Sequence, residues 1–217
     1  MINSVDADEI MKGILSSPRE SRALEFKPSF PWPSKDDLLK NSKAQEAIEA
    51  TLAMSNLPDG GKIILGVEKS SQTDNTLICK GVTPEHLQTY DQDVIFNIVR
   101  NCGDPEPSFQ VLNVLWNGMN FIVFAVQRFT FTPVISTNWK HLRQDSHSVL
   151  FIRTDKPETK KVTTPAEIRE IIELAVEREL DTFSARMQRV FRTMSQIKVP
   201  KSSADDQNKF ANEMGDL

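Results

Sequence analysis

Cysteine and histidine are scarce in this 217-residue chain, and their scarcity excludes several kinds of site. The only cysteines are Cys79 and Cys102, and the three histidines are scattered along the sequence. Because no Cys-x-x-Cys pair occurs, a zinc ribbon and a redox pair are excluded, and we expect no zinc. Two isolated cysteines are typical of a chain that stays reduced in the cytoplasm.

Long apolar runs and a large charge imbalance are also missing. No apolar stretch approaches the roughly 20 residues that a membrane helix requires, and the acidic N-terminus does not resemble a signal peptide. We therefore expect a cytoplasmic protein without a membrane partner. The net charge of −4 argues against nonspecific coating of nucleic acid by the whole surface, but it permits binding through a local basic patch.

The residues that are present form a globular composition, with 39% apolar and 26% charged side chains. Their order predicts a mixed α/β (α+β) fold, a mixed sheet flanked by helices with a long C-terminal helix. Asn117-Gly118 lies between two apolar-rich runs and is the strongest hairpin signal in the chain. We expect strands at 23–27, 62–67, 77–80, 108–116, 119–127 and 148–153, helices at 5–16, 43–56, 83–101 and from 164 onward, and a loop at 129–145.

The first expected strand has a clear two-residue alternation. Leu24 and Phe26 are placed on one face, toward the core, and Glu25 and Lys27 share the other face. The proline-rich segment that follows, 28–33, cannot be a helix or a central strand. Its aromatic residues either pack at the core edge or stack on a ligand, and packing is favoured because aromatic side chains are mostly buried.

The C-terminal helix carries a heptad seam that has two interpretations. Apolar residues recur at alternating steps of four and three, so the helix either packs along its own domain or pairs with a second copy as a homodimer. We divide the chain into a domain at 1–175, a helical extension at 176–199 and a disordered polar tail at 200–217. The seam consists of Val176, Leu180, Phe183, Met187, Val190, Met194 and Ile197.

Three glutamates are expected near strand ends. Glu20 and Glu25 lie on either side of a predicted bend, and Glu68 leaves a strand that is expected to neighbour the Leu24–Phe26 strand. Three carboxylates that converge repel one another unless a cation lies between them, and oxygen-only ligands suit Mg²⁺ or Mn²⁺. Such an ion can polarise a phosphoryl oxygen and activate water, so phosphodiester cleavage is a natural use, with Lys27 steadying the phosphate.

The motifs together resemble the Schlafen AlbA-type domain, a family once described as divergent ATP-binding or DNA-binding domains. The resemblance spans about residues 19–177. It rests on these residues in this order: Glu20-Ser21, Leu24-Glu25-Phe26-Lys27, Asn56, Gly60-Gly61, Gly66-Val67 and Phe151-Ile152-Arg153.

The resemblance implies a mixed α/β fold and a single-lobe bacterial or phage member of the family. In animal Schlafens two such lobes clamp structured RNA such as tRNA, and some of them cleave it with three acids. Two of those acids match Glu20 and Glu25. The third would be Glu68, where aspartate is usual in the family, and this departure shifts the metal. The zinc site of the animal proteins has no counterpart here, and a homodimer could rebuild their clamp.

These expectations give one leading function and two alternatives. The leading hypothesis is a metal-dependent endoribonuclease that acts on structured RNA, with RNA favoured over DNA. Its catalytic and metal residues are Glu20, Glu25 and Glu68, and its nucleic-acid contacts are Lys27, Lys140, Arg143 and Arg153.

The first alternative is a noncatalytic module that binds DNA or RNA, in which Glu20 caps a turn and Glu25 pairs with Lys27 or Arg153. The second is a nucleotide-binding protein in which the segment 59–61 cradles a phosphate. No Gly-x-x-x-x-Gly-Lys-Ser/Thr loop occurs, so ATP hydrolysis is poorly supported, and the glycine pair is more simply a helix-stop turn.

Overall fold

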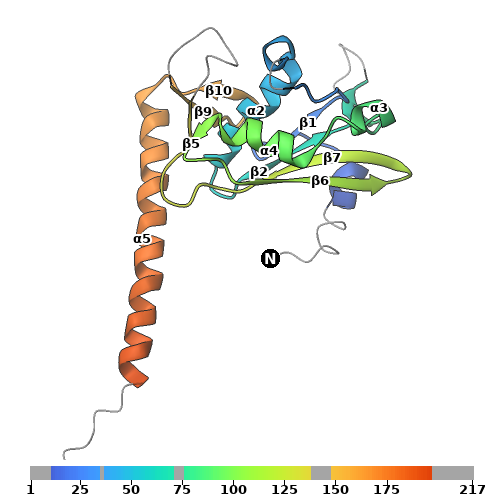
Figure 1. Cartoon of the computed structure of the whole chain (residues 1–217). Helices are drawn as coiled ribbons and strands as arrows, with labels where there is room; N and C mark the ends of the chain where they lie inside the picture. The colour runs from blue at the N-terminus through green and yellow to red at the C-terminus, as the bar shows by residue number, and fades with distance from the viewer. Residues whose placement is uncertain (1–10, 35–36, 71–75, 138–147, 197–217) are drawn as a thin grey trace, which may run out of the picture. The chain divides into compact units, whose positions relative to one another are not determined.

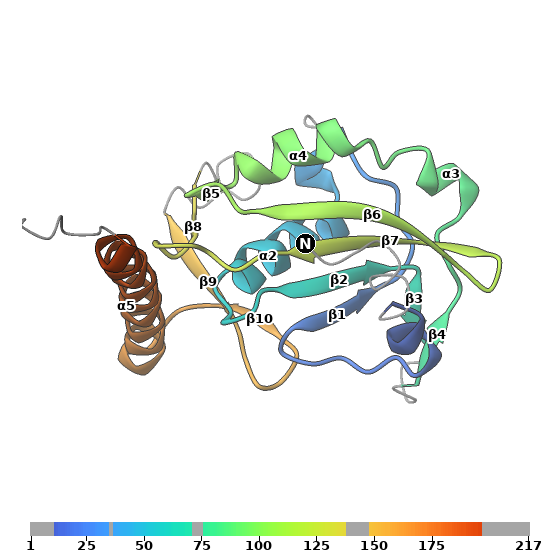
Figure 2. The same ribbon diagram turned by 90° about the horizontal axis from the view of Figure 1, so that it is seen from below.

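A computed structural model describes residues 11–34, 37–70, 76–137 and 148–196. The chain divides into two units, Met1–Val176 and Glu177–Leu217. The first unit is a mixed α+β domain, as predicted, and its sheet and helices are drawn in Figures 1 and 2. The predicted tail at 200–217 lies outside the described residues, and the treatment of 176–199 as a separate extension stays a prediction.

The main sheet has the strand order β1-β2-β7-β6, and Figure 2 shows these four strands side by side. Strand β1 runs parallel to β2, whereas β2–β7 and β7–β6 are antiparallel. The Asn117-Gly118 hairpin joins β6 to β7, and both residues have the positive φ angles that a tight hairpin turn requires. The strands are β1 Leu24–Lys27, β2 Gly61–Leu65, β6 Phe109–Trp116 and β7 Met119–Val126.

Two smaller sheets complete the strands of this unit. One has the order β10-β9-β8-β5, and the other is the antiparallel ribbon β3–β4. Strand β8 lies within the segment that the sequence predicted to be a loop at 129–145, because a two-residue strand is too short to show a period. The bounds are β3 Val67–Lys69, β4 Leu77–Cys79, β5 Gly103–Asp104, β8 Ile135–Ser136, β9 Val149–Arg153 and β10 Thr159–Lys161.

Helices cover both faces of the main sheet, as Figure 1 shows. One face packs against helices α2 and α4 in the larger hydrophobic cluster, and a short helix at residues 11–16 covers part of the other face. The helices are η1 Leu38–Lys40, α2 Ser42–Ser55, α3 Pro84–Leu87, α4 Gln92–Arg100 and α5 Pro165–Gln196.

The single helix predicted at 83–101 is wrong, because the structure divides it into α3 and α4. The side chain of Asp91 accepts a hydrogen bond from the Val94 backbone nitrogen and begins α4 as a new helix. This is a standard N-cap, and a cap in mid-segment starts a helix instead of continuing one. The apolar period of the two helices runs on across the break, which is why the sequence suggested one helix.

The aromatic residues of the 28–33 segment pack into the core, as the favoured interpretation predicted. Phe30 and Trp32 are 3% and 4% exposed, and both rings contact Tyr90. Among the residues that the structure describes, no helix has both the length and the apolarity to span a membrane.

Candidate functional site

Strand β1 directs its charged residues toward helix α2. Leu24 and Phe26 lie in the hydrophobic cluster on the opposite face of the sheet, as the alternation predicted. Glu25 and Lys27 therefore point to the α2 face, and there the register pairs Glu25 with Ile63 of β2. Lys27 is only 7% exposed, so this polar face of β1 is buried as well.

Four charged side chains meet at this position, and we call them the Glu25 cluster: Glu25, Lys27, Glu46 and Arg153. One carboxylate oxygen of Glu25 accepts a hydrogen bond from Arg153 Nη1 at 2.6 Å, and the other lies 2.8 Å from Lys27 Nζ. The ammonium of Lys27 also donates to Glu46 of α2 at 2.9 Å. The cluster thus holds two cations and two anions and is electrically balanced.

Arg153 ties three segments of the chain together. Its Nε and Nη2 atoms donate to the backbone oxygens of Arg22 and Ser21 at 3.1 and 3.3 Å, and Nη1 also donates to Thr159 Oγ1 at 3.0 Å. In return, Arg22 Nε donates to the Arg153 backbone oxygen at 3.0 Å. The side chain of Arg153 is 1% exposed, so its donors are directed at protein groups and not at solvent.

Burial acts against both cations of the cluster. It lowers the pKa of Arg153, and the negative charges of Glu25, Glu20 and Glu158 offset this only in part. Burial also lowers the pKa of Lys27, but Glu25 and Glu46 more than offset that effect, so the pKa of Lys27 is raised overall. Both side chains, predicted as nucleic-acid contacts, are therefore buried ion-pair partners with little surface to offer a phosphate.

Glu68 lies apart from the Glu25 cluster. The register pairs Lys27 with Leu65, at the end of β2, and Glu68 comes three residues later in the β3–β4 ribbon. Its carboxylate pairs with Lys80, and both side chains are partly exposed to solvent. The predicted neighbourhood of the two strands is confirmed, but Glu68 belongs to a different, more exposed ion pair.

Glu20 is closer to the cluster. The Ser21–Leu24 bridge turns the chain just before β1, and Glu20 is near enough to Arg153 to influence the pKa of that guanidinium. It also lines an open hollow of about 320 Å³ together with Pro18, Arg19 and two residues of the β3–β4 ribbon, Lys69 and Leu77. Two of the three predicted carboxylates, Glu20 and Glu25, are thus close enough to Arg153 to interact with its positive charge.

This arrangement does not fit a three-carboxylate metal site. Within the described residues, no group of three His, Cys, Asp or Glu side chains lies close enough together to hold a metal ion. Both Glu25 oxygens already accept from a cation, and the Glu68 carboxylate has its own lysine. A divalent ion would have to displace these ammonium and guanidinium groups before it could bind.

The glycine pair considered as a phosphate cradle has a packing role. Gly60 has φ +75°, and an added Cβ there would lie 2.2 Å from the Val126 backbone oxygen. At Gly61, an added Cβ would meet Met54 at 2.6 Å. Both positions need glycine because other parts of the chain approach them closely. The space above the pair is filled by protein, which does not favour the nucleotide-binding interpretation.

Asn56, another residue on which the family resemblance rests, makes a second set of buried contacts. Asn56, 3% exposed at the end of α2, donates to the backbone oxygens of Val134 and Phe151 at 2.9 and 3.0 Å. Its own oxygen accepts from the Val134 backbone nitrogen at 2.8 Å. Asn56 therefore holds the middle of strand β9 and Arg153 holds its last residue, so the separate motif residues form one connected framework.

Two partners in the site were missed from the sequence. Neither Glu46 nor Thr159 was predicted as a partner. A glutamate one helical turn into α2 carried no local signal, because its partner is set by where α2 crosses β1. Lys140 and Arg143, the other predicted nucleic-acid contacts, lie outside the described residues.

Comparison with known proteins supplies a family. The sequence profile of the family described as Schlafen, AlbA_2 matches residues 20–164. No curated protein sequence matches the chain. Two solved structures are similar in fold. The DIP2311 protein from Corynebacterium diphtheriae has 18% identity and a TM-score of 0.41, and the similarity covers 70% of this chain and 25% of that one.

The second structure is the N-terminal domain of a RecG-related protein from Nitrosomonas europaea. It has 16% identity and a TM-score of 0.40, with coverage of 73% of this chain and 95% of that one. The present chain therefore spans about a quarter of the length of DIP2311 and nearly all of the RecG-related domain.

Proposed function

The chain belongs to the Schlafen AlbA_2 family, and on this basis we propose that it binds nucleic acid as a noncatalytic module. In this proposal the Glu25 cluster is a structural element that fixes strand β9 and the turn before β1. The observation that carries the proposal is the double pairing of Glu25 with Arg153 and Lys27 at 2.6 and 2.8 Å. A carboxylate held in this way is a counterion, because both its oxygens are already neutralised.

Phosphate contacts in this proposal come from basic residues outside the Glu25 cluster. The net charge is −4, so binding depends on a local group of cations. Lys140 and Arg143 are the proposed contacts, since Lys27 and Arg153 are buried. RNA is the proposed partner ahead of DNA, and the proposed location is the cytoplasm, where Cys79 and Cys102 stay reduced.

The metal-dependent endoribonuclease is the second candidate, and one observation favours it. Glu20 and Glu25 both act on Arg153, so two of the three acids share one locality. Cleavage would require Glu25 to leave its two cations and bind Mg²⁺ or Mn²⁺ together with Glu20 and Glu68. The arrangement described here favours the noncatalytic module, because each ion pair would have to be broken first.

The binding experiment is a fluorescence-anisotropy titration with a labelled structured RNA and a duplex DNA of the same length, repeated at several salt concentrations. We expect binding that weakens steeply with salt, with a slope that falls by about one for each phosphate contact removed. Lys140→Ala and Arg143→Ala should reduce that slope, and Lys12→Ala, on the short helix that covers the other face of the sheet, is the matched control. Equal binding by all three variants and the wild type would exclude Lys140 and Arg143 as phosphate contacts. The absence of binding at low salt would refute the proposal that the chain binds nucleic acid.

Catalysis is tested separately on the same RNA with Mn²⁺ added. We expect no cleavage by the wild type. Metal-dependent cleavage that is lost in Glu20→Gln would establish the second candidate, and Glu20 is the suitable variant because its carboxylate has no close ion-pair partner among the described contacts.

A further inference from the structure

Helix α5 carries an apolar stripe that faces solvent. Val176 is 53% exposed, and Leu180 and Phe183 are each 61% exposed, although all three are large apolar side chains. The stripe also includes Ile172, Met187 and Val190, of which Ile172 and Val190 are 55% and 46% exposed. Large apolar residues in a continuous row on a soluble helix mark a contact surface.

The stripe is distinct from the part of the helix that packs on the domain. Within the first unit, Ile171 is buried, and Leu174 and Ala175 pack against the larger hydrophobic cluster. At 100° per residue, these residues lie on one side of the helix and the stripe lies roughly 130° around it. The exposed stripe is therefore not the side that supports the domain core.

The spacing of the stripe is symmetric about the midpoint between residues 181 and 182. Leu180 and Phe183 are equidistant from it, Val176 and Met187 are equidistant, and Ile172 mirrors Val190 to within one residue. When two copies of a helix pair in opposite directions, each residue meets the one at its mirror position. Every mirror pair in this stripe is apolar on both sides, so the stripe is complementary to itself in the antiparallel arrangement. A parallel pair in register would also match apolar residues with apolar residues, so the charges must decide the orientation.

The charges of α5 are divided in the same way. Residues 165–181 contain six acidic side chains and two arginines, whereas residues 182–196 contain three arginines and no acid. Parallel pairing would place acid beside acid and arginine beside arginine. Antiparallel pairing places the acidic half beside the basic half, which is the charge complementarity that selects a partner and an orientation.

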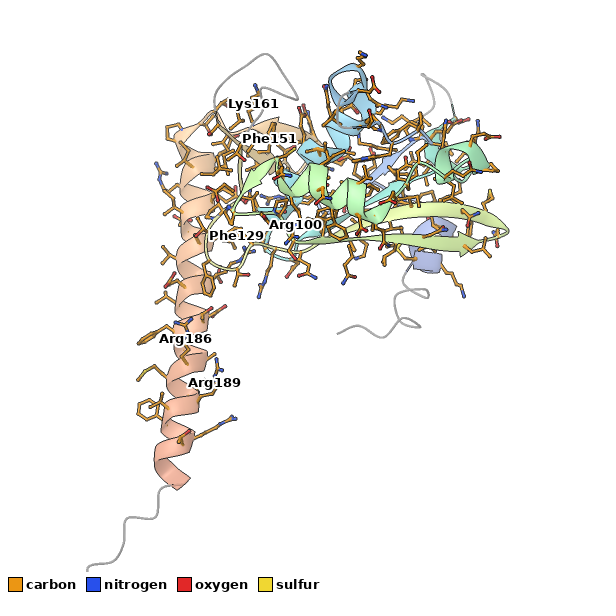
Figure 3. All side chains as sticks on the ribbon, in the orientation of Figure 1. Arg100, Phe129, Phe151, Lys161, Arg186 and Arg189 are labelled. Atoms are coloured by element: carbon orange, nitrogen blue, oxygen red, sulfur yellow. The ribbon has the colours of Figure 1, made fainter. Side chains whose placement is uncertain are left out.

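One pair of flanking residues is specific to this arrangement. Glu179 and Arg186 lie on the same edge of the stripe, and antiparallel pairing brings Glu179 of one copy to within two residues of the level of Arg186 of the other, twice per dimer. Within one helix they are seven residues apart, about 10 Å along the axis, so they do not reach each other. Figure 3 shows Arg186 projecting from the distal half of α5.

We infer that α5 forms an antiparallel two-stranded helix pair with a second copy of this chain, centred between residues 181 and 182. The pair buries the stripe and neutralises the opposed charges of the two helices. This inference is independent of whether the domain binds nucleic acid or cleaves it.

The test begins with the mass of the full-length chain in solution, measured by light scattering on a sizing column across a range of concentrations. We expect twice the chain mass at high concentration, and Leu180→Lys should reduce it to that of one chain. Gln188→Lys is the matched control, because it adds the same charge at an exposed position off the stripe. A monomeric wild type at all concentrations would overturn the inference, as would dimers that persist in Leu180→Lys.

Orientation is tested by charge exchange. Glu179→Arg and Arg186→Glu should each weaken the dimer at least several-fold, and the double exchange should restore it. A parallel dimer in register would gain nothing from the double exchange, because Glu179 of one copy and Arg186 of the other then lie about 10 Å apart along the axis. Failure of the rescue overturns the antiparallel arrangement.

A distance measurement gives the second readout. A spin label on Thr193→Cys should give an interchain separation of about 34 Å along the axis, because residue 193 lies opposite residue 170. A parallel pair would place the labels roughly 10 Å apart. The wild-type chain, labelled in the same way, supplies the background from Cys79 and Cys102. A short distance between the two labels would refute the antiparallel arrangement. A monomer in which nucleic acid or the chain's own tail covers the stripe would refute the proposed dimer.

Discussion

Replacing Glu25 by glutamine distinguishes a structural ion pair from a metal ligand by the sign of the stability change. The variant keeps the shape of the side chain and removes its charge. In the structure, Arg153 is 1% exposed and Glu25 is 13% exposed, so the pair is shielded from solvent. Removing one member of a buried pair leaves an uncompensated charge and typically costs about 3–5 kcal/mol.

We expect the lower end of that range, about 3 kcal/mol, because Arg153 keeps its backbone and Thr159 acceptors. Lys27 also keeps Glu46 as its partner. For a chain of this size, about 3 kcal/mol lowers the melting temperature by about 6–12 °C. Thermal and urea unfolding followed by circular dichroism measure this directly, without any ligand.

Glu68→Gln is the matched control. It makes the same chemical change in the partly exposed Glu68–Lys80 pair, and exposed pairs contribute at most about 1 kcal/mol. If the three glutamates instead formed a cluster awaiting a metal, the loss of one negative charge would relieve repulsion and raise stability. A Glu25→Gln variant as stable as Glu68→Gln, or more stable than the wild type, would refute the structural role.

Three further predictions concern other parts of the domain. Asn56→Ala should lower the free energy of unfolding by about 2–4 kcal/mol, because it strips buried backbone groups of their hydrogen bonds, and urea titration measures it. The pKa of Glu167 is lowered to about 2 by Lys160 and by the backbone amides it caps, so its contribution to helix α5 is present above about pH 4.5 and is lost as the pH falls toward 2. Circular dichroism at 222 nm over that range should show the wild type losing helicity, whereas Glu167→Gln should have the lower helicity already at pH 7. Identical acid titration curves for the two proteins would contradict this. Burial raises the pKa of Cys102 to about 12, so a thiol reagent at pH 8 should modify it only after unfolding, and modification at the rate of a free thiol in the folded chain would be the contrary result.

Much of the fold was predictable because its signals are local. The alternation of Leu24, Glu25, Phe26 and Lys27 assigned each residue to a face of β1, and Asn117-Gly118 fixed the β6–β7 hairpin. Such patterns involve only a few neighbouring residues, so they can be recognised without knowing how the elements pack. The break between α3 and α4 was missed because a cap residue inside a continuous apolar period is a weaker signal than the period itself.

The site was predictable only in part, because the sequence named its residues correctly but left two sets of partners open. The sequence singled out Glu25, Lys27 and Arg153, and all three meet in one cluster. The leading hypothesis assigned them to a metal and to phosphate, whereas the first alternative paired Glu25 with Lys27 or Arg153. The structure shows both of these pairs.

By itself, the sequence determined which side chains share a strand face or a helix face, including the symmetric stripe and the divided charge of α5. These properties follow from the 2.0 and 3.6 residue periods of the backbone. Only the tertiary structure decided that Glu25 meets Arg153, 128 positions away along the chain, and that Glu68 does not join them. The physical reason is that the choice of a counterion depends on which elements cross at the edge of a sheet, and no local pattern records that crossing.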